Sequence, residues 1–327
     1  MHRRLTAVLV CLIAALALPS AASAFGPPFA LQITGSRAPY FVLSGQPGTT
    51  LSSSVTVINV GSVSGGVTLY GTDGTTGQTS GAVYGTEQTR RTDVGAWIAL
   101  SQHHLMLGPG QYATVPFQVV IPAGVRGGQH LGGIVAQPDQ PIQQFGGTRG
   151  KTSFHVQVRA LSVIAVQVNL PGALTQRLVI TGVSSTGARG RQLLLVGIAN
   201  PGTALTKGSG AITVSDGPGR RIRVPFTLDT FVPQTHIEYP VQVTGRALPA
   251  GDYRAIVTVA SGGGRQTRVM PLTITQKSLE QAFGSRYTAP PPITGRSILP
   301  FIIGGLVLVV AGFSIGARAR ARRPAER

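Results

Sequence analysis

Histidines and carboxylates are the side chains best able to do chemistry here, and their spacing argues against a reaction. His103 and His104 are adjacent, so on a strand they would point to opposite faces, a poor geometry for chelating one metal ion. His130 and His155 could approach them only through the fold. The ten acidic residues are spread singly, so no carboxylate pair for acid–base catalysis is visible. We therefore expect no enzyme, no cofactor and no metal site.

The sequence contains neither a complete phosphate-binding loop nor a nucleophile elbow. Gly150-Lys-Thr152 resembles the end of a phosphate-binding loop, but the position that requires Gly, five residues earlier, is Phe145. The surroundings are rich in strand-forming residues, with no following helix. No Gly-x-Ser-x-Gly elbow occurs. The sequence thus points to binding.

Aromatic residues form the first candidate binding group. Trp97 is the only tryptophan, and Tyr84 precedes it in a stretch rich in Gly and Thr. An aromatic face can stack on a sugar ring, so Tyr84 and Trp97 are candidate glycan-binding residues. The alternative for Trp97 is a place in the core.

Arginines form the second candidate group. Arg220, Arg221 and Arg223 follow a Gly-Pro-Gly turn, and alternation on a strand would place Arg221 and Arg223 on one face. Such a face could meet a polyanion: teichoic acid phosphates, anionic lipid headgroups or an acidic partner protein. The alternative is an edge strand that charge protects from pairing.

The elements that must position these residues read as strands. The chain has 44 Gly and 23 Pro among 327 residues, abundant β-branched residues and no amphipathic helical period before the C-terminal region. Strand-like runs recur every 8–15 residues or so, which predicts an all-β fold of two tandem immunoglobulin-like β-sandwich domains, 25–168 and 169–276.

The two halves look like repeats of one another. Asn59 and Gly61 are matched by Asn200 and Gly202, 141 residues later, whereas Pro116-Phe-Gln-Val119 is matched by Pro240-Val-Gln-Val243, only 124 later. The drop predicts about 17 extra residues in the first domain, within 71–97. Loops on a rigid scaffold often carry recognition, so this excursion is the preferred binding surface.

The ends of the chain predict export and a membrane anchor. Residues 1–24 resemble a signal peptide, 277–297 a Pro-rich stem, 298–317 a transmembrane α-helix and 318–327 a basic cytoplasmic tail. We expect a single-pass cell-membrane protein with its N-terminal part extracellular and its C-terminus cytoplasmic. Export argues against nucleic acid as a partner. Pro291-Pro-Ile-Thr-Gly295 imitates a sortase sorting signal.

Short motifs appear in the order found in the WxL-interacting protein family of Gram-positive bacterial surfaces, which the chain resembles over about 95 residues. They are Phe41-x-Leu43, Gln46-Pro-Gly48, Val55-Thr-Val-Ile-Asn59, Gly81-x-x-Tyr84, Trp97, Leu107-x-Pro-Gly110, Ile121-Pro-Ala-Gly124 and Gly127-Gly-Gln-His-Leu-Gly-Gly-Ile134. The resemblance implies a peptidoglycan-binding first domain and a second domain that binds a host or partner, such as a WxL-type surface protein.

Together these observations predict a non-enzymatic cell-surface scaffold that contacts peptidoglycan and a surface protein or anionic polymer. Two alternatives stay open. One is a membrane-anchored assembly chaperone or accessory subunit that lends a strand edge to a secreted client. The other is a wall protein processed by sortase.

Overall fold

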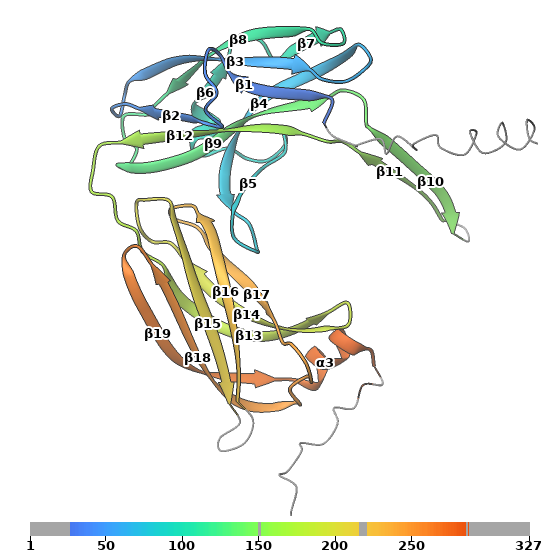
Figure 1. Cartoon of the computed structure of the whole chain (residues 1–327), viewed down its shortest axis with the longest axis vertical. Coiled ribbons are helices and arrows are strands. Elements are labelled where there is room, and N and C mark those ends of the chain that lie inside the picture. The colour runs from blue at the N-terminus through green and yellow to red at the C-terminus, as the bar shows by residue number, and fades with distance from the viewer. Residues whose placement is uncertain (1–26, 150–151, 216–220, 286, 288–327) are drawn as a thin grey trace, which may run out of the picture.

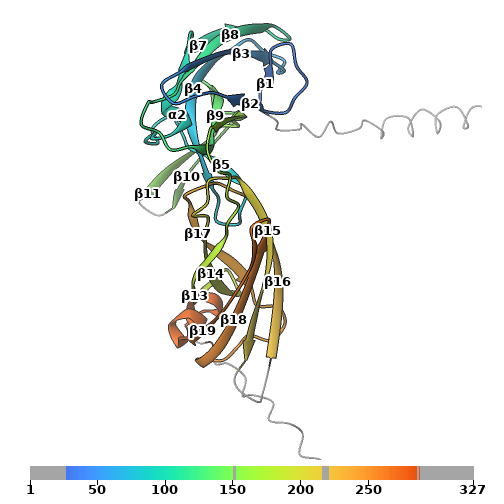
Figure 2. The same ribbon diagram turned by 90° about the vertical axis from the view of Figure 1, so that its left-hand side faces the viewer.

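Alternating buried and exposed residues build the first of two β-sandwiches. In β8, for example, Val115, Phe117 and Val119 are buried while their neighbours face out. The computed structural model describes residues 27–149, 152–215, 221–285 and 287, and everything below concerns this part of the chain. Figures 1 and 2 show the first sandwich above the second, joined end to end.

Two sheets form the first sandwich. One has the order β1-β3-β8-β6, and the other has the order β2-β12-β9-β4-β5, with β7 also pairing with β4. The core between them includes Phe41 and Phe117, whose rings meet edge to face at 5.1 Å. The strands are β1 (Phe29–Ile33), β2 (Phe41–Ser44), β3 (Thr50–Asn59), β4 (Gly65–Thr76), β5 (Ala82–Tyr84), β6 (Ile98–Leu100), β7 (His104–Leu107), β8 (Tyr112–Val120), β9 (Gly128–Pro138) and β12 (Ser162–Leu170).

The second sandwich repeats this plan. A sheet β13-β14-β17 faces a sheet β16-β15-β18-β19, and a separate apolar core lies between them. Its strands are β13 (Val179–Ala188), β14 (Arg191–Ala199), β15 (Thr206–Ser215), β16 (Arg221–Phe231), β17 (His236–Gln242), β18 (Gly251–Ser261) and β19 (Gly264–Ile274). The expected all-β fold with two β-sandwich domains of immunoglobulin type is confirmed.

Equivalent asparagines show how closely the sandwiches match. The buried Asn59 amide donates to the carbonyls of Val63 and Leu107, and its oxygen accepts from the Gly61 N–H. Asn200 does the same with Ala204, Phe231 and Gly202. The two distant partners, Leu107 and Phe231, are 124 residues apart while the asparagines are 141 apart, so the contacts reproduce both offsets of the repeat.

A third, two-stranded sheet leaves the first sandwich. It consists of β10 (Gln143–Arg149) and β11 (Thr152–Val158), which pair with each other alone. They continue the hairpin begun by β9 and β12, and Figure 1 shows them projecting away from both sandwich bodies. We call β10 and β11 the ribbon.

Helices are short. α2 (Val94–Trp97) is one turn, and α3 (Gln276–Phe283) is capped by the Thr275 side chain and packs on the second core through the fully buried Leu279. The predicted stem 277–297 therefore opens with a packed helix, because Leu279 and Ala282 lie on one buried face. Its remainder from 288, the signal peptide 1–24, the transmembrane segment 298–317 and the tail 318–327 lie outside the described residues.

Candidate functional site

The ribbon is amphipathic. Its register pairs Gln143 with Val158, Phe145 with Val156 and Gly147 with Phe154, so one face carries four apolar side chains and the polar Gln143. The opposite face carries Gln144, Thr148, Ser153, His155 and Gln157, which are all polar. Alternation of this kind normally buries the apolar face against a second sheet.

No second sheet covers the apolar face in the described part of the chain. Phe145, Phe154, Val156 and Val158 are 52, 50, 46 and 37% exposed. Leu161 and Val163, between the ribbon and the sandwich, are also exposed, at 36 and 39%. An isolated two-stranded hairpin gains little stability by itself, and a contiguous exposed apolar stripe marks an interaction surface.

The outer edge of the same strands is open. β11 pairs with β10 on one side, and among the described residues no strand pairs with it on the other. Farther along, β2 occupies that edge beside Val166–Asn169 of β12, in parallel register. The edge of β11 from Ser153 to Val158 therefore presents main-chain N–H and C=O groups next to apolar side chains. Between it and the open part of β12 at Val163–Ala165, residues 159–161 are not in a strand and the Ser162 hydroxyl donates to the Phe29 carbonyl.

The excursion predicted as the binding surface instead ties the two sandwiches together. The Thr76 hydroxyl lies 2.6 Å from the Thr235 hydroxyl and accepts from the Val232 N–H at 2.9 Å. The Ser80 hydroxyl accepts from the Asp229 N–H at 2.8 Å. Residues 71–84 thus form a strut against the second domain.

Glycines allow a second close contact at the linker. Any side chain on Gly127 would collide with the carbonyl oxygen of Pro171, and one on Gly128 would lie 2.6 Å from the Thr203 carbonyl oxygen. Gly128 also has φ of +123°, which L side chains rarely adopt. Gln129 then donates its N–H to the Thr203 carbonyl and accepts from the Leu205 N–H.

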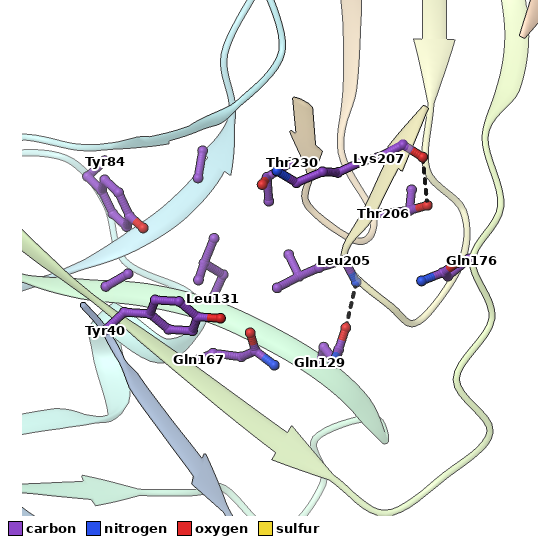
Figure 3. Close-up of a pocket in the computed structure, with 12 residues that line it drawn as sticks. Tyr40, Tyr84, Gln129, Leu131, Gln167, Gln176, Leu205, Thr206, Lys207 and Thr230 are labelled. Carbon is purple, nitrogen blue, oxygen red and sulfur yellow. Dashed lines mark hydrogen bonds between the residues drawn. The ribbon is translucent and has the colours of Figure 1, made fainter. Parts of the chain in front are cut away.

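A cleft of about 640 Å³ remains between the sandwiches (Figure 3). Tyr40 and Tyr84 line it from the first domain, and Lys207 and Thr230 line it from the second. Burial raises the pKa of Tyr84, so its hydroxyl stays protonated at neutral pH. Lys207 is paired with Asp229 at 2.6 Å. The lining of the cleft mixes polar and apolar side chains, and it includes Ala165 of β12.

Trp97 and Tyr84 do not form one platform. Trp97 is 6% exposed and belongs to the first core, where its ring packs 5.0 Å from that of His130. It borders a different groove, near Pro233 and Gln234, and not the cleft that Tyr84 lines. The structure therefore does not bring the two candidate aromatic rings together.

His103, His104 and His130 occupy three separate environments, and His155 lies on the ribbon. His103 faces the Leu69 carbonyl, His104 pairs with Asp139 at 2.8 Å, and His130 contacts Asp93 and the Arg126 carbonyl, each at 2.8 Å. Burial lowers the pKa of His130, but the hydrogen bonds to Asp93 and Arg126 and the Asp93 charge outweigh it, so the pKa is raised. These contacts position loops; none reaches the ribbon.

Arg221 and Arg223 lie on one face of β16, in agreement with the alternation argument, and Arg220 lies outside the described residues. Sequence reasoning missed the ribbon. It identified 152–158 as a strand, but the alternation of Phe154, Val156 and Val158 does not reveal that the opposing layer is missing.

Comparisons with known proteins give a likeness in structure only. No family model matches the chain, and no curated protein matches it. The class 5 fimbriae chaperone CfaA is 10% identical with a TM-score of 0.36, covering 73% of this chain and 98% of that one. The Escherichia coli chaperone DraB is 15% identical with a TM-score of 0.33, covering 75% and 98%. A chain of the Salmonella enterica SafA pilin–SafB chaperone complex is 12% identical with a TM-score of 0.34, covering 75% of this chain and 97% of that one. Function does not follow from scores of this size.

Three expectations are corrected. The resemblance to the WxL-interacting family is wrong: no family model matches, and the similar structures are fimbrial chaperones. Its short motifs, rich in Gly and Pro, mark turns that many β-sandwiches share. Binding to peptidoglycan loses its support with that family, and none of the similar structures supports binding to teichoic acid. The single-pass membrane localisation is also corrected: the described residues, which do not include 298–317, hold no helix long and apolar enough to cross a bilayer.

Proposed function

We propose that this chain is a non-enzymatic assembly chaperone that binds an extended segment of a secreted client along the open edge of β11. One observation carries the proposal: an amphipathic ribbon exposes its apolar face and its main-chain edge together. The similar structures named above are also chaperones, but the proposal rests on the ribbon.

The apolar face supplies affinity. Phe145, Phe154, Val156 and Val158 are each about half exposed. Covering a half-exposed side chain of this size gains roughly 1 kcal/mol, so the four together supply several kcal/mol. A client that lacks a strand in its own sandwich would offer the missing apolar layer.

The edge supplies alignment. A client strand added beside β11 would form main-chain hydrogen bonds in a fixed register, which places its alternate side chains on the ribbon's apolar face. Farther along the chain, Ala165 of β12 lines the cleft with Tyr40 and Gln167.

The test uses a fluorescent nine-residue peptide that alternates Val and Thr, with a proline-interrupted peptide as its control. Val156→Asp places a charge on the apolar face, and Gln157→Asp places the same charge on the polar face next to it. We expect Val156→Asp to weaken anisotropy-detected binding at least tenfold and Gln157→Asp less than twofold.

Equal losses in the two variants, or equal affinity for the proline-interrupted peptide, would contradict strand capture. Light scattering measures the oligomeric state of the free protein, which tests whether a second copy of this chain occupies the ribbon. A dimer that Val156→Asp dissolves, combined with no peptide binding, would mean that the ribbon serves a second copy of this chain instead of a client.

A further inference from the structure

The outer face of the second domain's larger sheet brings together three arginines that are far apart in sequence. Ser215 of β15 pairs with Arg221 of β16 on one side and with Arg254 of β18 on the other. One step along, Thr213 pairs with Arg223. Cross-strand partners share a face, so the three arginines surround two hydroxyl-bearing residues. We call Arg221, Arg223 and Arg254 the arginine face.

The spacing suits a single anionic group. Neighbouring strands lie about 4.8 Å apart, so the α-carbons of Arg221 and Arg254 are about 10 Å apart, with the Ser215 side chain between them. Arg223 is two residues along the strand from Arg221, a rise of about 6.7 Å. Two guanidinium groups can therefore converge over Ser215, and the third can reach the next group along.

No carboxylate neutralises this face in the described part of the chain. None of the ion pairs there involves the three arginines, which are all exposed. Asp252 lies on the same face, two residues from Arg254, and its carboxylate accepts from the Thr273 hydroxyl at 2.7 Å, so one negative charge stands beside the three positive ones. The local charge remains positive.

Protection of a sheet edge explains only part of the cluster. β16 is an edge strand, and charges at Arg221 and Arg223 would discourage pairing with another chain. Arg254, however, lies on β18, which pairs with β15 and β19 on both sides. Edge protection therefore accounts for Arg221 and Arg223 and leaves out Arg254, which lies on the solvated face of an interior strand.

We propose that the arginine face binds a linear polyanion whose repeating group is a phosphate. A carboxylate has two oxygens, and one guanidinium satisfies both in a bidentate pair. Two guanidiniums and a hydroxyl that converge on one site call for a group with more oxygens, as in phosphate. This site lies on the second domain and is independent of client capture by the ribbon.

The probe is short-chain inorganic polyphosphate, with polyglutamate of equal charge as the comparison, titrated calorimetrically at low and high salt. Arg221→Gln/Arg223→Gln/Arg254→Gln should weaken polyphosphate binding at least tenfold. The matched control, Arg189→Gln/Arg191→Gln/Arg265→Gln, removes the same charge elsewhere on the domain and should cost less than threefold.

A conservative variant separates geometry from charge. Arg221→Lys/Arg254→Lys keeps the net charge but loses the planar fork, so we expect a severalfold loss for polyphosphate. Equal losses in the two triple variants, full retention by the lysine variant, or equal affinity for polyglutamate would each overturn the proposal. Unchanged thermal unfolding of every variant shows that the fold is intact.

Discussion

The two sandwiches share one plan and differ most in their last hairpin. In the second domain, β18 and β19 are joined by Gly262 and Gly263 alone. In the first, the equivalent strands β9 and β12 are separated by residues 139–161, which include the ribbon. Because the second sandwich closes its core without such an extension, the ribbon is an addition that the fold itself does not require.

A second difference lies in one edge strand. β16 is continuous from Arg221 to Phe231, whereas its counterpart in the first domain is divided into β5 and β7 with residues 85–103 between them. The inserted chain packs α2 on the first sandwich, and β5 leans toward the second domain. One domain thus carries both the ribbon, for which we propose a client, and the strut that contacts its neighbour.

The largest loss of peptide binding is expected when the β9–β12 hairpin is shortened to resemble the β18–β19 hairpin. Replacing residues 143–158 by Asn-Gly, a turn suited to a two-residue hairpin, should abolish binding of the alternating peptide. The free energy of unfolding should change by less than about 1 kcal/mol, because the deleted face is exposed. Anisotropy and urea unfolding measure the two quantities. A loss of several kcal/mol would show that the ribbon supports the sandwich.

Next in size are the matched asparagines. Asn59→Ala or Asn200→Ala deletes three hydrogen bonds and should cost about 3 kcal/mol in the domain concerned. Trp97 lies in the first core, so its fluorescence reports chiefly on that domain. We expect Asn59→Ala to shift the fluorescence-detected transition and Asn200→Ala to shift only circular dichroism. Equal fluorescence shifts in both would mean that the domains unfold as one unit.

A smaller effect is expected at the strut. Thr76→Val keeps the shape but removes the acceptor of the Val232 N–H, at a cost of about 1–2 kcal/mol to the contact between domains. Small-angle scattering should then show a broader distribution of interdomain distances. Thr75→Val, at an exposed neighbouring position, is the control. An unchanged profile in the Thr76 variant would place the coupling at Gln129 instead.

The smallest effect concerns pH. His130 has both ring nitrogens on acceptors, and its pKa is raised above 6.5 in the folded state. The stabilisation that protonated His130 adds to the folded state is therefore fully present below pH 6.5. It disappears as the pH rises through the raised folded-state pKa. We expect the first domain to lose less than about 1 kcal/mol across that window, and His130→Gln to remove this dependence. Stability that rises with pH would contradict the sign.

Patterns confined to one strand were predictable from sequence, and those between strands were not. Alternation identified most strands, and turn chemistry at Asn59 and Asn200 exposed the repeat, because both are local properties. The burial of Trp97 depends on α2 folding back onto the sheet, which no periodicity records. Arg254 joins Arg221 only through the register of β15, and α3 was missed because only eight residues carry its pattern.

Because of the two glycines at the linker, the orientation of the ribbon relative to the second domain is sensitive to very small changes in sequence. Where Gly127 meets Pro171 and Gly128 meets Thr203, a single methyl group would act as a wedge and tilt one sandwich against the other. The ribbon belongs to the same hairpin as these glycines, so the tilt would redirect a docked client relative to the second domain. A substitution at either glycine could thus change which clients bind, although no client contacts these positions. Homologues that bind clients of the same shape should keep glycine at both positions.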